Sequence, residues 1–185
     1  ALSALRSGAG LVTLGVPESL NPVIEHQALE VMTHPLPEIT TGILSDESFD
    51  VIMDLVSDKR CLALGPGMGT TPETRRLVAR LVNSCPIPLI IDADGLNNLA
   101  ANTDILKSKK TEIILTPHPG EMARLIGKSP RDVQADRIDC ARKFAEKFKV
   151  HLVLKGARTV IAHPDGHVYV NPTGNPGMAS AGMGD

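Results

Sequence analysis

Four short clusters rich in glycine, proline and charged residues each follow directly after a predicted strand. They are Gly65–Gly69, Asp92–Gly95, Thr116–Glu121 and Lys155–Thr159. In an open parallel sheet, ligands bind outside the carboxyl ends of the strands. We therefore expect the four clusters to lie at one edge of a sheet and to form a common site, rather than to serve only as turns.

The glycine-rich cluster has two interpretations. Gly-Pro-Gly-Met-Gly at residues 65–69 could let a ligand approach the backbone closely, because glycine has no Cβ to exclude it. The cluster is neither a Walker loop nor a dinucleotide fingerprint, since it lacks the Lys-Ser/Thr pair and the spacing of the final glycine. An ordinary strand-to-helix turn explains the same residues.

The acidic residues and one histidine could bind substrate or move a proton. Asp92 and Asp94 could face a cation or a hydroxylated ligand, although Asp94 could equally cap the short helix that follows. His118 and Glu121 lie beside two stiffening prolines, and a rigid histidine near a carboxylate can hydrogen-bond substrate or shuttle protons. An ordinary surface histidine is the alternative. The other histidines show no metal-ligand spacing, which argues against a structural zinc site.

Two segments could bind phosphate. Lys155–Thr159 combines a cation, bare backbone and a hydroxyl, although solvated charges on a β-turn would have the same sequence. The Gly-x-Gly-Asp turn at residues 182–185 is the most specific pattern, because such a turn entering a helix offers free N–H groups to an anion. Asp185 could take a proton from a hydroxyl nucleophile. Phosphoryl transfer needs this pairing of dipoles and a base.

The elements that must position these residues alternate between strands and helices. Strands are predicted at residues 10–16, 28–33, 61–64, 88–91, 112–115, 151–155, 159–162 and 167–171. Helices are predicted at residues 1–8, 45–56, 71–83 and 96–101. Another follows the Thr116–Glu121 cluster and ends at residue 126, and the longest spans residues 130–149. Apolar strands alternating with helices are typical of a mainly parallel sheet covered on both faces. The pattern predicts one layered α/β domain.

Length and composition exclude several classes of protein. The 185 residues suit one domain, and 42% hydrophobic with 22% charged residues is ordinary for a folded chain. With 19 Lys+Arg against 21 Asp+Glu, one Tyr, three Phe and no Trp, a nucleic-acid binder is not expected. No apolar run reaches the roughly 20 residues of a membrane span. Cys61, Cys85 and Cys140 match no metal or disulfide pattern, and we expect them to be buried cytosolic thiols.

Taken together, the motifs resemble those of the NAD(P)H-hydrate dehydratases, metabolite-repair members of the ribokinase-like superfamily. The matching segments are 4–13, 65–69, 91–97, 116–121, 155–159 and 174–185, in order and nearly end to end. The resemblance implies a ribokinase-like α/β fold, with helices on both faces of a mainly parallel sheet in three layers. Because the chain opens without Met and stops on a glycine-rich turn, we expect residues 1–185 to be a single domain incomplete at both termini.

The resemblance also implies an activity. The family uses ADP or ATP, with Mg²⁺, to phosphorylate the ring hydroxyl of (S)-NADH or (S)-NADPH hydrate, and loss of phosphate restores NAD(P)H. The nicotinamide nucleotide is therefore substrate, and no hydride transfer is needed. The Thr at the end of the 155–159 loop is similar to that of the ADP-using members. Without the segment that follows the Gly-x-Gly-Asp turn in the family, the chain alone is expected to be weakly active or inactive.

Roles are implied residue by residue. Asp185 matches the catalytic base and also a position that contacts the hydrate. Gly67 and His118 match two further positions that contact the hydrate. Asp94 is another candidate for substrate binding. The nucleotide-binding positions are matched by Lys155, Gly156, Ala157, Arg158, Thr159 and Gly184. Glu121 falls where kinase relatives keep an acid that organises Mg²⁺, with His118 replacing their Asn.

The resemblance further implies a cytoplasmic homo-oligomer, commonly a tetramer, that works with an NAD(P)H-hydrate epimerase domain or protein. It implies neither a nucleic-acid nor a membrane partner. Two alternatives stay open. One is a small-molecule hydroxyl kinase of the same superfamily, of the hydroxyethylthiazole kinase kind. The other is a non-catalytic nucleotide-binding module.

Overall fold

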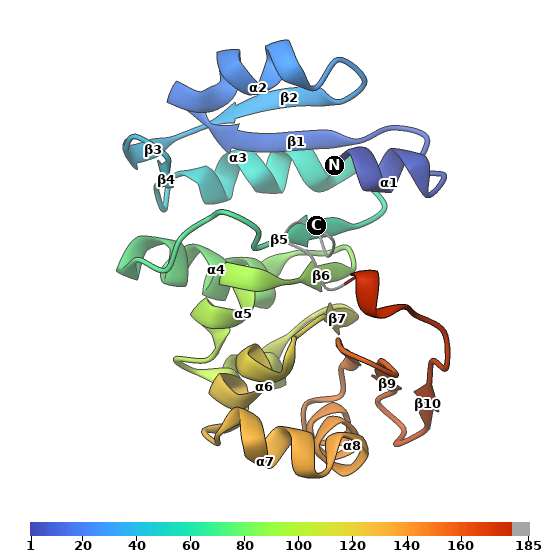
Figure 1. Cartoon of the computed structure of the whole chain (residues 1–185). Coiled ribbons are helices and arrows are strands. Elements are labelled where there is room, and N and C mark those ends of the chain that lie inside the picture. Colours follow the sequence, from blue (N-terminus) through green and yellow to red (C-terminus); the bar gives the residue numbers. More distant parts are fainter. Residues whose placement is uncertain (179–185) are drawn as a thin grey trace.

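A six-stranded sheet forms the centre of the computed structural model, which describes residues 1–178 (Figure 1). Its strands are β5 (Leu62–Leu64), β6 (Leu89–Ile91), β7 (Ile113–Leu115), β8 (His151–Leu154), β9 (Val160–Ala162) and β10 (Val168–Val170), in the order β10-β9-β8-β7-β6-β5. The pairings β5–β6, β6–β7 and β7–β8 are parallel, whereas β9 and β10 pair antiparallel. The prediction of a mainly parallel sheet is confirmed.

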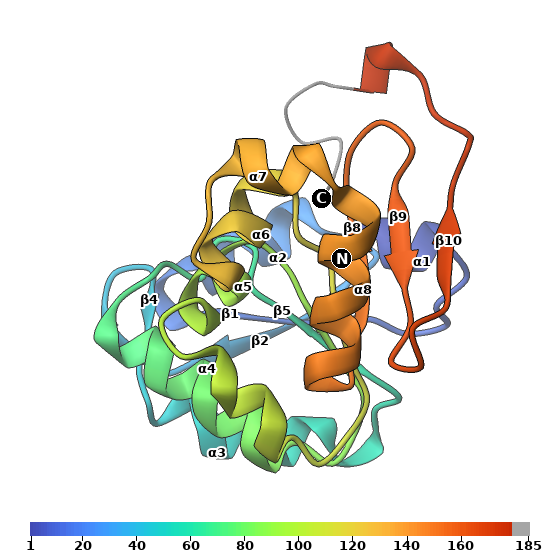
Figure 2. The same cartoon turned by 90° about the horizontal axis from the view of Figure 1, so that it is seen from below.

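Helices connect the parallel strands. They are α4 (Pro72–Ser84), α5 (Ala93–Leu99), the 3₁₀ helix η3 (Thr103–Ser108), α6 (Pro119–Ile126), α7 (Pro130–Ala135) and α8 (Arg137–Phe148). Each crossover leads from one parallel strand to its neighbour in the same direction, and right-handed crossovers then place these helices on the same face of the sheet. Figure 1 shows α4, α5 and α6 following one another along one side of the strands, and Figure 2 shows α8 beside β8 and β9.

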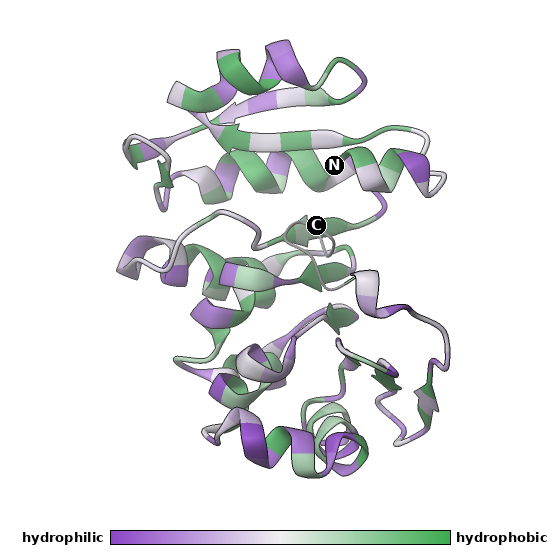
Figure 3. Ribbon diagram, in the orientation of Figure 1, coloured by the Kyte–Doolittle hydropathy of each residue, from purple (hydrophilic) through white to green (hydrophobic). Residues whose placement is uncertain are grey.

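Burial alternates along the strands, as the pleat requires. On the helix-covered face, all of the following are less than 1% exposed: Leu89, Ile91, Ile113, Leu115, Leu152 and Leu154. The opposite face carries Ile90, Ile114, Val153 and Ile161, which are half-buried. Hydrophobic residues dominate the strands in Figure 3. Among the described residues, the helical layer expected on both faces is thus present on one.

A smaller unit formed by residues near the N-terminus lies at the β5 end of the sheet (Figure 1). It contains α1 (Leu2–Arg6), β1 (Thr13–Pro17), η1 (Glu18–Leu20), α2 (Asn21–Gln27), β2 (Met32–Leu36), the hairpin β3 (Glu38–Thr40) and β4 (Ile43–Leu44), α3 (Ser48–Leu55) and η2 (Val56–Asp58). Strands β1 and β2 pair in parallel as a separate sheet. The helix α3 contacts both β2 and α4, and so joins this unit to the main one.

Local signals account for most of the element positions. Helix α4 begins after Thr71, which forms a capping box with Thr74, and has Pro72 in its first turn. The predicted helix at 71–83 and the strands that precede the four clusters are confirmed within a residue or two. The 3₁₀ turn η4 (Pro176–Met178) interrupts the loop expected after residue 171.

Three predictions for the elements are wrong. The helix expected at 130–149 is two helices, because Asp136 adopts non-helical backbone angles (φ −149°, ψ 78°) and caps α8. The strand expected at 28–33 is β2, four residues later, and helix α2 precedes it unpredicted. Helix α5 begins at Ala93, not at residue 96, because Asp92 already occupies the N-cap position.

The three cysteines differ in how far they are exposed to solvent. Cys85 is buried, Cys140 is half-buried and Cys61 is exposed; all three are free thiols, and the expectation of burial is wrong for Cys61. No helix in residues 1–178 is both long enough and apolar enough to cross a bilayer.

Candidate active site at the carboxyl ends of the parallel strands

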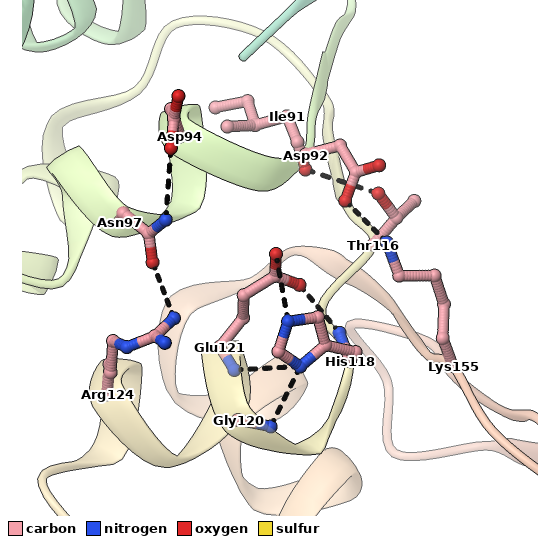
Figure 4. Close-up of polar contacts among 10 residues, drawn as sticks. All are labelled: Ile91, Asp92, Asp94, Asn97, Thr116, His118, Gly120, Glu121, Arg124 and Lys155. Atoms are coloured by element: carbon pink, nitrogen blue, oxygen red, sulfur yellow. Dashed lines mark hydrogen bonds and ion pairs between the residues drawn. The ribbon is translucent and has the colours of Figure 1, made fainter. Parts of the chain in front are cut away.

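Hydrogen bonds and one ion pair connect the loops that follow β5, β6, β7 and β8. The Lys155 backbone N–H donates to the Pro117 carbonyl at 2.8 Å, and its ammonium lies 2.7 Å from Asp92 Oδ1. The Gly69 N–H donates to Asp94 Oδ2 at 3.0 Å. The prediction that the four clusters lie together at one edge of the sheet is confirmed, and Figure 4 shows the three loops around Asp92, His118 and Lys155.

The glycine-rich loop lies against the loop after β6. Gly65 has φ +128°, and a Cβ built on it would lie 1.8 Å from the Asp92 carbonyl oxygen, so that no larger residue fits. Gly67 has φ +72° and is exposed, with nothing within 4 Å of the position of a Cβ. The backbone at Gly67 is therefore open to a ligand, whereas Gly65 is required for packing.

Asp92 holds the N-cap position of α5 without capping the helix through its side chain. Its carboxylate instead turns to Lys155, and the next residue, Ala93, adopts the left-handed conformation with φ +47°. A left-handed non-glycine residue costs of the order of 1 kcal/mol and persists only where the surrounding contacts impose it. The strained turn at Ala93 thus separates two aspartates that face different partners.

Asp94 supports the glycine-rich loop. One carboxylate oxygen accepts the Gly69 N–H, and the other accepts Asn97 Nδ2 at 3.3 Å. Asn97 in turn accepts Arg124 Nη1 at 2.7 Å (Figure 4). Asp94 lies in the first turn of α5 and not at its N-cap, so the alternative in which Asp94 caps this helix is wrong.

Asn98 is a positioning residue that the sequence analysis missed. It is 3% exposed, and its Nδ2 donates to the carbonyls of Gly69 and Asp94, both at 2.9 Å. The i, i+4 spacing from Asp94 places the two side chains on the same face of α5, and this spacing is the signal that could have identified Asn98.

His118 and Glu121 form a reciprocal cap at the start of α6. His118 Nδ1 accepts the N–H groups of Gly120 (2.9 Å) and Glu121 (3.3 Å), and Glu121 Oε2 accepts the His118 N–H at 2.8 Å. Because Nδ1 acts as an acceptor, the proton of the neutral ring is on Nε2, 3.4 Å from Glu121 Oε1. Half of the His118 side chain stays exposed and can contact a ligand.

Glu121 does not have the surroundings of a metal ligand. Its side chain is 7% exposed and both oxygens face His118. Among residues 1–178, no three His, Cys, Asp or Glu side chains gather closely enough to hold a metal ion. Glu121 is thus engaged by His118 in this structure, and its role toward Mg²⁺ stays a prediction.

The loop after β8 presents its backbone to solvent. Gly156, Ala157 and Arg158 are exposed, and Thr159 Oγ1 donates to the Gly156 carbonyl at 3.0 Å. Gly156 has φ +139° and Arg158 has φ +57°. Within the described part of the chain, the N–H groups of residues 156–158 donate no hydrogen bond. Successive free N–H groups in such a turn form a concave anion-binding surface.

Two of the predicted site residues, Gly184 and Asp185, lie outside the described residues.

Comparisons with known proteins agree over the whole chain. A family model described as NAD(P)H-hydrate dehydratase matches residues 1–185. The bifunctional NAD(P)H-hydrate repair enzyme of Moorella thermoacetica is 47% identical over 185 residues, which are all of this chain and 35% of that protein. The chain therefore spans about a third of the length of this curated relative.

Solved structures show the same fold. An ADP/ATP-dependent NAD(P)H-hydrate dehydratase from Bacillus subtilis, co-crystallised with ATP and Mg²⁺, superposes with a TM-score of 0.76 at 31% identity, over 99% of this chain and 61% of that one. A ribokinase-like superfamily protein from Enterococcus faecalis has a TM-score of 0.76 at 23% identity, covering 97% of this chain and 59% of that one, and supports the fold alone. The fold is ribokinase-like, and the chain belongs to the NAD(P)H-hydrate dehydratase family.

Proposed function

We propose that the protein dehydrates (S)-NADH and (S)-NADPH hydrate with ADP, or with ATP, as phosphoryl donor, and so repairs damaged nicotinamide nucleotides. The observation that carries the proposal is the contact of Lys155 with Asp92 at 2.7 Å, beside the His118 loop. It brings a loop with free amides, suited to a polyphosphate, next to the open backbone at Gly67 and the exposed face of His118. Family membership supports the same reaction.

The proposed reaction proceeds in two steps, phosphorylation and elimination. The ring hydroxyl oxygen attacks the terminal phosphorus of the nucleotide, a base takes the hydroxyl proton, and AMP or ADP leaves. The C–O bond of the phosphate ester then breaks, assisted by the ring nitrogen lone pair, while a proton leaves the neighbouring ring carbon. Inorganic phosphate and the dihydronicotinamide result, and no oxidant or reductant is needed. Phosphate leaves where hydroxide would not.

The described residues divide into two groups in this proposal. Lys155–Thr159 binds the nucleotide phosphates through its free amides and the Lys155 ammonium. Gly67 and His118 contact the hydrate, the former through backbone and the latter through its exposed ring. Asp94 acts on the same ligand by holding the 65–69 loop, because one of its oxygens accepts the Gly69 N–H.

Three further assignments come from the family resemblance. Asp185 serves as the base that takes the hydroxyl proton, and Gly184 contributes to the nucleotide site. Mg²⁺ bound with the nucleotide would neutralise phosphate charge, while Glu121 itself is engaged by His118.

The partners are also part of the proposal. Relatives named as bifunctional repair enzymes support an NAD(P)H-hydrate epimerase domain or protein as the companion activity. We propose a cytoplasmic protein that forms a homo-tetramer and consists, over residues 1–185, of one ribokinase-like domain that is part of a larger one. Sedimentation of the complete gene product tests the tetramer.

The decisive experiment incubates the complete gene product that contains these residues with hydrated NADH and ADP or ATP. The expected result is recovery of the near-ultraviolet absorbance of the dihydronicotinamide, with release of phosphate, only when nucleotide is present. A stable phosphorylated product without recovered absorbance would instead identify a hydroxyl kinase. Nucleotide binding without turnover of any kind would identify a non-catalytic module.

A matched pair of variants connects this activity to the site. Lys155→Met removes the ammonium next to Asp92 and should raise the KM for ADP by about tenfold, as expected for the loss of one charge-assisted contact. Lys143→Met is the control, because Lys143 is an exposed partner of Asp139 on α8, away from the loop. Equal KM values for the two variants would contradict the role of Lys155.

A further inference from the structure

Arg137, the first residue of α8, lies directly beneath the loop that follows β8. Its Nη1 donates to the Ala157 carbonyl at 2.6 Å, and its Nη2 donates to the carbonyls of Leu154 (3.0 Å) and Lys155 (3.1 Å). One guanidinium group therefore binds three carbonyl oxygens of a four-residue segment. The planar fork of arginine spreads its donors over separate nitrogens, whereas lysine carries all its donors on one nitrogen.

The loop is shaped around this guanidinium. A Cβ built on Gly156 would lie 3.0 Å from Arg137 Nη2, so the glycine allows the side chain to pack against the loop backbone. Arg158 in this loop adopts a left-handed conformation (φ +57°), which for a residue other than glycine needs outside contacts to persist. Among the described residues, Arg137 supplies three such contacts.

The direction of the carbonyls decides the direction of the amides. Because the carbonyls of Leu154, Lys155 and Ala157 point toward Arg137, the peptide planes that contain them turn the following N–H groups away from it. Those that follow Lys155 and Ala157 belong to Gly156 and Arg158, and neither donates a hydrogen bond within residues 1–178. Arg137 thus accounts for the free amides on the exposed side of the loop.

The charge of Arg137 is also available to a ligand. The part of the chain that the structure describes contains no carboxylate paired with Arg137, whereas Arg80 and Arg142 are both paired. Its Nε is buried without a hydrogen-bond partner. A partly buried cation without a carboxylate partner is costly unless an anion compensates it.

We propose that Arg137 is a positioning residue of the nucleotide site: it holds the backbone of residues 154–157 so that the loop amides bind the phosphates of ADP. This inference rests on the proposed function for the identity of the ligand. Arg137 itself does not contact the reacting atoms. The break at Asp136 makes Arg137 the first residue of α8, the position from which its side chain reaches the loop.

The test measures ADP affinity by calorimetry and the separate steady-state constants in the complete gene product. Arg137→Gln should raise the Kd and KM for ADP about tenfold or more. The variant loses the charge-assisted hydrogen bonds from the guanidinium to the loop carbonyls, and a tenfold rise in Kd corresponds to about 1.4 kcal/mol of binding free energy. The kcat and the KM for the hydrate should stay within about threefold. Arg142→Gln is the control, because Arg142 lies on the same helix and pairs with Asp139.

A second variant keeps the test decisive if Arg137→Gln does not fold. Arg137→Lys retains the charge and the aliphatic stem but loses the fork, so ADP binding should weaken to an intermediate degree. Either variant, folded by circular dichroism and binding ADP like the unmodified protein, overturns the proposal. A lowered kcat with unchanged ADP affinity also overturns it.

Failure of this inference can be told apart from failure of the proposed function. If the unmodified protein binds ADP but does not restore NADH, the proposed reaction is wrong, and the binding comparison still decides the role of Arg137. If the unmodified protein binds neither ADP nor ATP, both proposals are wrong.

Discussion

The Lys155 ammonium and the Asp92 carboxylate form a 2.7 Å ion pair across the carboxyl ends of β6 and β8, with β7 between them. The two side chains are 33% and 18% exposed, so water screens the pair only in part. Between these strands, the Pro117 carbonyl accepts the Lys155 N–H. The pair therefore joins the loop after β6 to the loop after β8, and the hydrogen bond to Pro117 joins the loop between them to the same cluster.

The strength of this pair can be measured by a double-mutant cycle. Asp92→Asn, Lys155→Met and the double variant should show a coupling of about 1 kcal/mol in urea unfolding, since partly exposed pairs contribute at the upper end of the surface range. The same cycle on Asp139 and Lys143, an exposed helix pair, should show less. A coupling for Asp92 and Lys155 no larger than for that control would contradict the structural role.

Two glycines of one loop should respond differently to alanine. Gly65→Ala places a Cβ 1.8 Å from the Asp92 carbonyl oxygen, so the loops must separate, and we expect a loss of about 3 kcal/mol or more in the free energy of unfolding. Gly67→Ala meets open space and adds only left-handed strain, a loss of about 1 kcal/mol. Denaturant unfolding distinguishes the two. Similar losses would mean that the two loops are not in contact.

His118 caps α6 and, in the proposed function, also contacts the hydrate; substitution can separate these two roles. His118→Ala should cost about 1 kcal/mol of stability, because the N–H groups of Gly120 and Glu121 lose their acceptor. His118→Asn keeps a good N-cap residue and should recover most of that stability. Both variants should raise the KM for the hydrate. A normal KM in His118→Asn would leave His118 with the capping role alone.

The proposed base gives the sharpest kinetic prediction. Asp185→Asn should keep the affinity for nucleotide and lose turnover by about 10²-fold or more, as expected when a positioned base is removed. Calorimetry with ADP and the absorbance assay measure the two effects independently. An unimpaired rate would remove Asp185 from this role.

The cysteines should differ in reactivity and in their effect at high pH. Burial raises the pKa of the Cys85 thiol, whereas Cys61 is exposed. A disulfide reagent should therefore modify Cys61 in the native protein and Cys85 only after unfolding.

The pKa shift of Cys85 also predicts the direction of a stability change. Above the ordinary thiol pKa of about 8.5, the unfolded chain releases a proton that the folded protein retains, so stability falls as the pH rises. Cys85→Ala should reduce this pH dependence, and Cys61→Ser should not. An unchanged slope in Cys85→Ala would show that the buried thiol is not its source.

Local sequence patterns were sufficient for much of the fold. Apolar runs located the parallel strands, and Thr71 with Pro72 located the start of α4, because capping and proline geometry act within a few residues. The same locality explains the errors: Asp136 lies between two helical patterns that read as one, and nothing near it indicates that Arg137 must reach the loop after β8.

For the site, the residue types and their places after the strands determined which loops meet, since parallel strands align their carboxyl ends on one edge. Only the tertiary structure decided what each side chain does there. Asp94 accepts the N–H of Gly69, 25 positions earlier in the chain. Asp92 turns to Lys155, 63 positions away in the chain. Such choices depend on distances between segments far apart in sequence, which no local pattern encodes.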